Sequence, residues 1–367
     1  MGFLEWLDTV VGRIRDSQSL HTKAGSLLQG LTPETMEKNG NGHPTLLLEK
    51  GLRFPIEKRT QNTTIAGVDS GFVSQSFYAL DFMLLRPAGV VFSYTNGKVT
   101  QTKYFPETFG LPEPLVHTEG LEKEEFHKFV SLKRLQSEAN TARELIETHS
   151  PYACFIDGSL IPLPADKPAK DSPIANEYTK TKEAFVRLYE AAKKKNCVLI
   201  GAIEDSRSDR LKEIVNEHVM RQNGLHIDGF EHLKDAPLLE HVLRAGERSI
   251  AFPYAKDCAQ HMILQDFPSP WAKQLHACYI KPSQWDYPLR IEFFGDAKTI
   301  ASFANEAAAI AMAQSSLHKE YAFPSVLIEA DLRAGLKPEE ISLVSDKIFS
   351  KVGRNTIHLR RRDRRPF

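Results

Sequence analysis

Long apolar runs are absent from this 367-residue sequence. No segment approaches the roughly 18 consecutive apolar residues that cross a bilayer, which excludes a membrane-spanning helix. An excess of one charge is also absent, since 47 Lys and Arg balance 47 Asp and Glu. This balance excludes a uniformly basic surface but not a local nucleic-acid site. The first sixteen residues carry acids within an apolar stretch and lack a small-residue cleavage site, so we expect no secretory signal and a cytoplasmic protein.

Cysteine is scarce. The four cysteines are too few for a disulfide scaffold and too far apart for a CxxC metal site, so we expect them to be reduced and buried: Cys154, Cys197, Cys258 and Cys278. Cys258 and His261 have the spacing of zinc ligands, but no second pair accompanies them. The sequence also has no GxGxxG, GxxxxGK[ST] or HExxH segment, which excludes the usual dinucleotide, P-loop and zinc-protease signatures.

The composition is that of a folded protein, with 41% apolar and 26% charged residues. At about 150 residues per domain, the length predicts two or three domains or one elaborated domain. We expect an N-terminal helical segment over 1–58, a main domain over 59–353 and an Arg-rich tail over 354–367. The tail has six Arg against one Asp. It is either a solubility tail or an arm that binds phosphates or a partner.

Hydrophobic periodicity predicts an α/β fold. Residues 63–77 are expected to form a strand, a turn and a second extended piece. Two further strands meet at the Asn96-Gly97 hairpin signal, which gives an antiparallel meander. Helices and buried strands then alternate, which predicts a mixed sheet with right-handed crossovers. At the N-terminus we expect an amphipathic helix over 3–15, with Leu4, Leu7, Val11 and Ile14 on one face, and a loop over 39–44. The central part should have helices over 122–149 and 175–195 and strands over 152–160 and 197–206. The C-terminal part should have strands near 248–252, 276–282 and 289–294 and helices ending near 246 and 317.

Three carboxylates occupy informative positions. Asp69 and Asp157 are expected to end two strands, and Glu138 lies on the intervening helix at the edge of its apolar stripe. A carboxylate facing a core is costly unless it is paired or bound to a metal ion. Such acids converging at strand ends can bind Mg²⁺ or Mn²⁺ and hydrolyse a phosphodiester by a two-metal mechanism. The alternative is that both aspartates form turns and that Glu138 pairs with Arg134, one helical turn earlier.

The ordered set of motifs resembles the NurA family of RNase H-like nucleases. The resemblance covers residues 60–335 and rests on these segments: GVDSG, RLQSEANTA, CFIDGSL, IGAIEDSRSDRL, DAPLLEHVLRAGERSIAF, CYIKP with PLRIEFF, and FPSVLIEADLRA. It implies an RNase H-like mixed sheet with flanking helices and a helical and β C-terminal elaboration. It also implies a Mn²⁺-dependent or Mg²⁺-dependent DNA nuclease that acts on single- and double-stranded ends. Further implied are a homodimer and a HerA-type hexameric ATPase partner in end resection during double-strand break repair.

The resemblance also assigns roles to residues of this sequence. It implies Asp69, Glu138 and Asp157 as metal ligands, with Asp235 as a further one, and Tyr279 as an aromatic near the scissile strand. Arg207 is a candidate phosphate contact or an ordinary exposed turn residue, and the tail adds the candidate DNA contacts Arg360, Arg361 and Arg362. One departure concerns the closing motif, which in the family usually ends in His. Here it is Glu329-Ala330-Asp331, so Asp331 is the candidate ligand.

Two other classes of function are compatible with parts of the sequence. A non-catalytic scaffold of the same fold would bind DNA or an ATPase. An actin-like ATPase is suggested by GVDSG, which resembles the first phosphate loop of that class. Against the ATPase, the second half has no Gly-rich adenosine-binding segment, and Glu138 would have no role.

Overall fold

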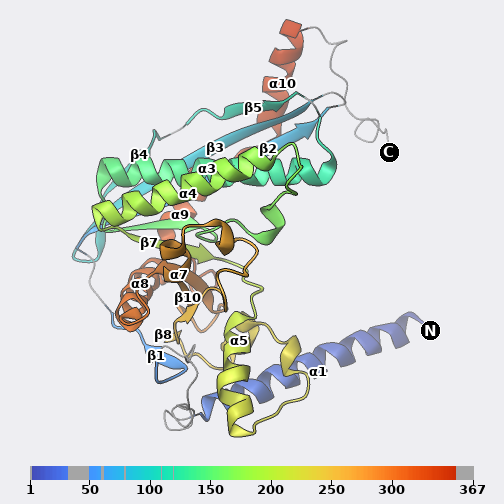
Figure 1. The fold of residues 1–367 in the computed structure, drawn as a ribbon, viewed down its shortest axis with the longest axis vertical. Coiled ribbons are helices and arrows are strands. Elements are labelled where there is room, and N and C mark those ends of the chain that lie inside the picture. The colour runs from blue at the N-terminus through green and yellow to red at the C-terminus, as the bar shows by residue number, and fades with distance from the viewer. Residues whose placement is uncertain are drawn as a thin grey trace. The chain divides into compact units, whose positions relative to one another are not determined.

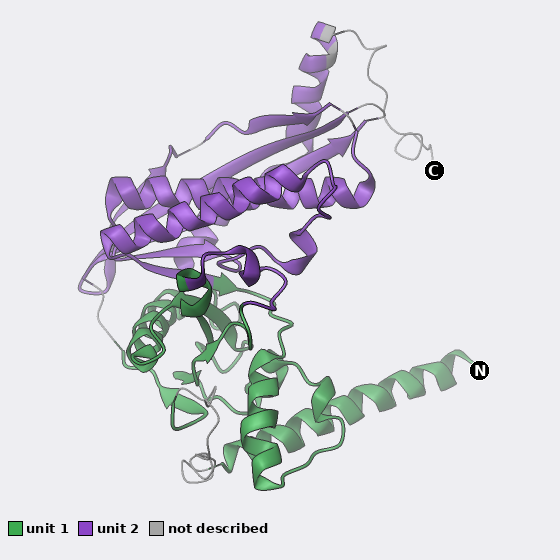
Figure 2. Ribbon diagram, viewed as in Figure 1, with its two compact units in different colours: residues 1–59, 202–258, 270–324 green, residues 60–201, 259–269, 325–367 purple. Residues whose placement is uncertain are grey.

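The computed structural model describes residues 2–31, 49–58, 62–77, 80–108, 110–118 and 120–352. The predicted loop over 39–44 and the Arg-rich tail lie outside these residues. The chain forms two compact units (Figure 2): unit 1 comprises residues 1–59, 202–258 and 270–324, and unit 2 comprises residues 60–201, 259–269 and 325–367. The three-part division into 1–58, 59–353 and 354–367 stays a prediction. The α/β class is confirmed, since helices flank a mixed sheet.

Unit 2 is built on the predicted meander. Strands β2 (Thr64–Ser76), β3 (Asp81–Thr95) and β4 (Lys98–Phe105) pair antiparallel, and β5 (Glu113–His117) also pairs with β3. Asn96 and Gly97 both have positive φ, as the predicted tight hairpin turn requires. Strand β6 (Ala153–Asp157) runs parallel to β2, and β7 (Val198–Ile203) follows it in the sheet.

The predicted turn at Asp69 is wrong, because β2 is one continuous strand of 13 residues. Gly67 and Gly71, two residues before and after Asp69, do not form a turn. They leave room for helix α9 (Ser325–Ala334), since a Cβ at Gly67 would lie 2.9 Å from Val326 Cγ1 and one at Gly71 would overlap the Ala334 carbonyl oxygen. Glycine within a strand here marks a close helix contact rather than a change of direction.

Helices α3 (Lys123–His149) and α4 (Ala175–Lys195) pack against each other, and α3 lies across β2 and β3 (Figure 1). Both confirm the predicted helices. The predicted apolar stripe of α3 is buried throughout: Phe126, Val130, Leu135, Ala139, Ala142 and Ile146. Helix α10 (Pro338–Val352) packs Ile341 against Phe77, Phe82 and Leu84. Short 3-10 turns occupy Pro164–Asp166 (η1) and Leu264–Asp266 (η5).

Unit 1 has its own antiparallel strands, and the predicted C-terminal strands are present. β8 (Glu247–Ser249) pairs with β1 (Arg53–Pro55) and β10 (Leu275–Ile280), and β10 also pairs with β9 (Phe252–Pro253) and β11 (Leu289–Phe294). The remaining elements are α5 (Arg210–Val215), a π-helical turn η2 (Asn216–Met220), η3 (Arg221–Asn223), η4 (Phe230–His232), α6 (Asp235–Glu240), α7 (Ser269–Gln274) and α8 (Ile300–Ser315).

The N-terminal helix α1 (Phe3–Gln29) is longer than predicted, and its contacts lie elsewhere. Ala24 and Leu28, near its end, enter the core of unit 1 beside residues of α5 and α6. The apolar face predicted for its first half is exposed rather than packed in a core, since Leu4 and Ile14 are 71% and 53% exposed. The first half of α1 therefore presents apolar side chains to solvent.

The sequence predicted no membrane-spanning helix and four reduced, buried cysteines. Among the helices that the structure describes, none is long and apolar enough to cross a membrane. All four cysteines are free thiols, and Cys154, Cys197 and Cys278 are buried as expected. Cys258 is only half-buried, so that expectation was wrong for one thiol. Its Sγ lies 3.3 Å from the Ala272 carbonyl oxygen at the edge of α7.

Candidate metal centre

Asp69 and Asp157 lie at the point where parallel pairing between two strands stops. The last pair in the register of β2 and β6 is Val68 with Ile156, so the next residue of each strand is one of the two aspartates. Asp69 is 4% exposed and Asp157 is half-buried. The carboxyl end of a parallel ladder is where open α/β sheets bind ligands. The two acids are therefore level with each other, although only Asp157 ends its strand.

Strand alternation directs Asp69 and Ser70 to opposite faces of the sheet. Asp69 shares the face of Gly67 and Gly71, which is the face that α9 covers. Ser70 points toward α3, where its Oγ donates to Glu138 Oε1 at 2.6 Å. The Ser70 backbone N–H donates to Asp69 Oδ1 at 2.7 Å. One strand residue thus orients two of the three central acids.

Glu138 is the most deeply buried acid of the group, with 1% of its surface exposed. Arg134 Nη1 lies 3.2 Å from Glu138 Oε1, the pairing expected from sequence as the alternative to a metal role. Glu138 Oε2 is buried and has no hydrogen-bond partner among the described residues. Burial raises the pKa of Glu138 to about 7, and the charge of Asp69 acts in the same direction, while Arg134 opposes it.

Asp331 on α9 reaches Asp69, as its place in the closing motif suggested. Burial raises the pKa of Asp69 and the neighbouring carboxyl of Asp331 raises it further, while the Ser70 backbone N–H and the charge of Arg134 oppose the shift. Glu329, in the same motif, is occupied elsewhere. Its Oε1 accepts hydrogen bonds from Tyr104 Oη at 2.9 Å and from Arg333 Nε at 2.9 Å. Asp331 is therefore the member of this motif that joins the acid cluster.

A guanidinium lies among these acids. The charges of Glu138, then Asp69 and Asp157, raise the pKa of Arg134, which shows that all three act on it. In the part of the chain that the structure describes, no three His, Cys, Asp or Glu side chains converge as a ready metal site. The donors nevertheless fit a hard divalent cation, because they are carboxylate oxygens and one of them, Glu138 Oε2, is buried without a partner. Asp69, Glu138, Asp157 and Asp331 are the residues that would hold it.

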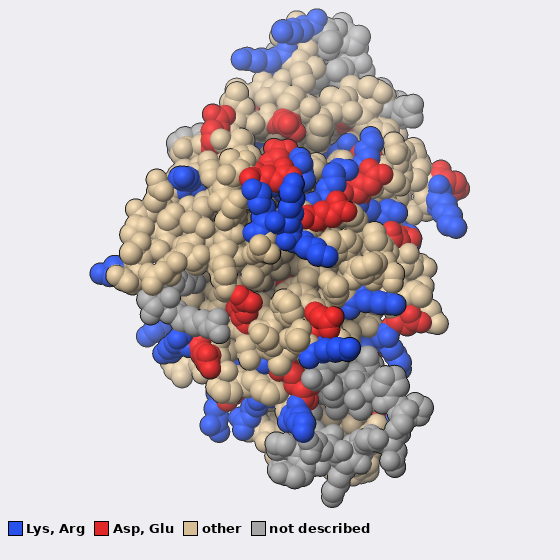
Figure 3. Space-filling model, turned by 60° about the vertical axis from the view of Figure 1, so that its left-hand side comes forward, with Lys and Arg blue, Asp and Glu red and all other residues tan. Residues whose placement is uncertain are grey.

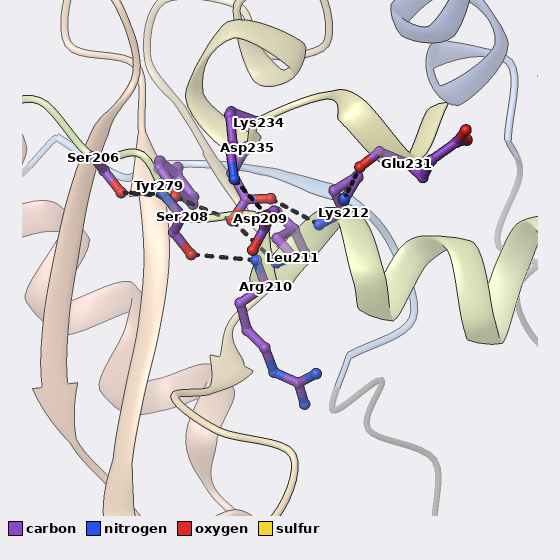
Figure 4. A network of polar contacts seen from close by, with 10 residues as sticks. All are labelled: Ser206, Ser208, Asp209, Arg210, Leu211, Lys212, Glu231, Lys234, Asp235 and Tyr279. Atoms are coloured by element: carbon purple, nitrogen blue, oxygen red, sulfur yellow. Dashed lines mark hydrogen bonds and ion pairs between the residues drawn. The ribbon is translucent and has the colours of Figure 1, made fainter. Parts of the chain in front are cut away.

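Asp235 and Tyr279 belong to unit 1, whereas the four acids above belong to unit 2. Asp235 caps helix α5 (Figure 4): its Oδ1 accepts from the Lys212 N–H at 2.8 Å and its Oδ2 from the Leu211 N–H at 3.1 Å. Tyr279 Oη donates to the same Oδ2 at 3.2 Å and lies 3.2 Å from Ser206 Oγ. The protein itself therefore occupies both oxygens of Asp235, and its role as a metal ligand stays a prediction.

Replacing Asp235 distinguishes these two roles. Asp235→Ala leaves two backbone N–H groups of α5 without an acceptor, which is expected to lower the free energy of unfolding by about 1–3 kcal/mol. Denaturant unfolding without metal measures this loss. Unchanged stability together with weaker Mn²⁺ binding would instead assign Asp235 to a metal site.

The pH dependence of stability is a second expected consequence of the site. A Glu138 pKa near 7 lies above its ordinary value of about 4.3, so the folded state retains a proton that the unfolded state has lost. Metal-free protein should therefore lose stability as pH rises from about 4.3 to about 7. Melting temperatures in EDTA should show this decline, and Glu138→Gln should make it smaller, leaving the part due to Asp69, whose pKa is also raised, whereas Glu144→Gln on the same helix should keep it in full. Coincident profiles for Glu138→Gln and the unmodified protein would contradict the assignment.

The surface charge in one view of the described residues shows no separate DNA site. On the face drawn in Figure 3, Lys and Arg lie among Asp and Glu rather than in one basic field. Arg207 is exposed in the segment before α5, which suits either a phosphate contact or an ordinary surface turn. Arg360, Arg361 and Arg362 lie outside the described residues. These four candidate contacts stay predictions.

Comparison with known proteins gives one sequence family and related structures. The model of the NurA domain matches residues 63–335. The crystal structure of the NurA nuclease from Sulfolobus solfataricus is similar, with a TM-score of 0.54 and 12% identity, over 83% of this chain and 88% of that chain. A NurA structure bound to dAMP and manganese has a TM-score of 0.46 and 9% identity, over 78% of this chain and 88% of that one. None of the curated proteins compared matches significantly.

Proposed function

The chain belongs to the NurA family, and from this premise we propose that it is a metal-dependent nuclease that hydrolyses DNA phosphodiesters. Family membership supports the class of reaction. The acid cluster of unit 2 supports the place where it occurs. A bound Mn²⁺ or Mg²⁺ ion would supply an activated water and charge stabilisation at the phosphate. The manganese bound in a related NurA structure belongs to that protein, and the ion used by this chain is part of the proposal.

This chain's residues divide the work of the site. Asp69, Glu138, Asp157 and Asp331 would provide oxygen ligands. Ser70 holds Asp69 through its backbone N–H and Glu138 through its hydroxyl, so two ligands are oriented before any ion binds. Gly67 and Gly71 allow α9 close enough to bring Asp331 beside Asp69.

The observation that carries the proposal is the buried, partnerless Glu138 Oε2 within a group of acids at the end of a parallel ladder. A structural carboxylate at this depth would be expected to have partners at both oxygens. The test is degradation of end-labelled single- and double-stranded DNA by the full chain with Mn²⁺, Mg²⁺ or EDTA. Cleavage that requires a divalent ion supports the proposal, whereas DNA binding without cleavage supports the scaffold.

The proposal extends to partners. We infer that the protein acts as a homodimer with a HerA-type ATPase in DNA end resection, as expected for its family. The first half of α1 supports a protein–protein contact, because Phe3, Leu4 and Trp6 are more than half exposed. Light scattering of the purified chain tests the dimer, and co-purification with the ATPase tests the second partner.

Deleting residues 354–367 separates the roles of the Arg-rich tail. If the tail follows DNA phosphates, its loss should weaken DNA binding and reduce the slope of affinity against salt concentration, since fewer counterions are released. Binding assays at several salt concentrations measure both effects. Loss of ATPase co-purification with unchanged DNA binding would identify a docking arm, and no change in either would leave a solubility tail.

A further inference from the structure

Arg134 is a positive charge built into a site that is otherwise acidic. We propose that Arg134 is the resident counter-ion of the acid cluster, and that a divalent metal ion replaces its guanidinium at Glu138. This inference rests on the proposed metal-dependent function and gives a role to a residue outside the predicted ligand set.

The contacts of Glu138 show how the guanidinium is held. Arg134 lies one helical turn before Glu138 on α3, and its Nη1 approaches Oε1 at 3.2 Å. Ser70 Oγ donates to the same oxygen at 2.6 Å. Oε2 has neither contact and no hydrogen-bond partner among the described residues. The guanidinium therefore contacts only one oxygen of the Glu138 carboxylate. In the strongest Arg–carboxylate pairs it contacts both.

Several further acids act on the same guanidinium. Asp69, Asp157 and Asp166 all favour its charged form. Asp166 is itself satisfied, because its two oxygens accept hydrogen bonds from Ser131 Oγ and the Leu163 N–H, each at 2.7 Å. Clustered carboxylates repel one another unless a cation lies among them. In the metal-free protein that cation is Arg134.

Exposure shows which partner can move. The Arg134 side chain is 31% exposed, whereas that of Glu138 is 1% exposed and fixed by Ser70. A long side chain at the surface can turn toward solvent without disturbing the core. Movement of Arg134 alone would therefore free the acids for another cation. Glu138 Oε2 is already available to that cation, because it accepts no hydrogen bond from Arg134 or Ser70.

The test compares Mn²⁺ binding by the metal-free full chain and its variants, using calorimetric titration. Arg134→Met removes the competing charge and should lower the Kd for Mn²⁺ about tenfold or more, the effect of one charge within about 4–6 Å. Arg143→Met is the matched control, because Arg143 lies on the same helix and pairs with Glu147 at 3.3 Å. The Kd of Arg143→Met should stay within about twofold of that of the unmodified protein, since Arg143 lies about two and a half helical turns after Arg134 and more distant charges are screened.

A second readout covers a variant that folds poorly without metal. Arg134→Gln should melt at lower temperature than the unmodified protein in EDTA, and Mn²⁺ should raise its melting temperature by more than it raises that of the unmodified protein. Adding Glu138→Gln to either variant should abolish the gain. Equal Kd values and equal Mn²⁺-induced shifts for Arg134 variants, Arg143→Met and the unmodified protein would overturn this inference alone. Absence of Mn²⁺ binding by the unmodified protein would overturn the proposed metal function as well.

Discussion

Asp69→Asn and Asp157→Asn should each lower the rate of DNA cleavage at least about 100-fold, because each removes a metal-ligand charge while keeping the side-chain shape. The fold should survive. Asp69 is buried beside Asp331 with a raised pKa, so the neutral amide relieves repulsion there. Rates on end-labelled DNA with Mn²⁺, together with circular dichroism, measure both parts of this expectation.

A matched control for these variants is Asp166→Asn. Asp166 also acts on Arg134, but its two oxygens are hydrogen-bonded to Ser131 and Leu163, which gives it a structural role. This control should keep most of the cleavage rate and lose stability instead. Cleavage by Asp69→Asn or Asp157→Asn at the unmodified rate would rule out the proposed metal centre.

Gly71→Ala should produce a large loss of stability in unit 2. A Cβ at this position would overlap the carbonyl oxygen of Ala334, which is helix backbone and cannot rotate away. Displacing α9 from β2 is expected to cost about 3 kcal/mol, the upper part of the range for overpacking. It should also weaken Mn²⁺ binding, because α9 carries Asp331.

Chemical denaturation of Gly71→Ala beside Gly110→Ala measures this effect. Gly110 is a suitable control, because no heavy atom lies within 4 Å of a Cβ built there. The control should unfold within about 0.5 kcal/mol of the unmodified protein, as expected for a surface position. Equal stability of the two variants would show that α9 can shift without cost, contrary to the close packing inferred at β2.

Much of unit 2 was predictable because its signals are local. The Asn96-Gly97 turn, the apolar stripe of α3 and the bounds of α4 follow from periodicity and turn chemistry. The turn at Asp69 was wrongly predicted because a glycine in a strand signals a bend and a close helix contact in the same way. Only the position of α9, more than 250 residues later, separates the two meanings.

The sequence predicted which acids form the site better than it predicted the contacts between them. The four predicted acids lie in one unit: Asp69, Glu138, Asp157 and Asp331. The sequence analysis missed Ser70, which follows Asp69 on β2 and whose side chain therefore points to the opposite face, toward Glu138. It also treated the Arg134–Glu138 pair as an alternative to a metal site, whereas the structure places that pair inside the acid cluster. The contacts of Asp235 could not be predicted from the sequence. Asp235 accepts hydrogen bonds from α5, and this pairing depends on tertiary folding that no local pattern reveals.

The most direct test of the proposed metal centre is the initial rate of end-labelled DNA degradation, measured against Mn²⁺ concentration. Three proteins are compared: the unmodified chain, Glu138→Gln and the exposed-site control Glu144→Gln, which lies on the same helix. The unmodified chain and Glu144→Gln should show the same saturable dependence on Mn²⁺, with no cleavage in EDTA, whereas Glu138→Gln should stay near background at every concentration. A Glu138→Gln curve that coincides with that of the unmodified chain would contradict the assignment of catalysis to this acid cluster.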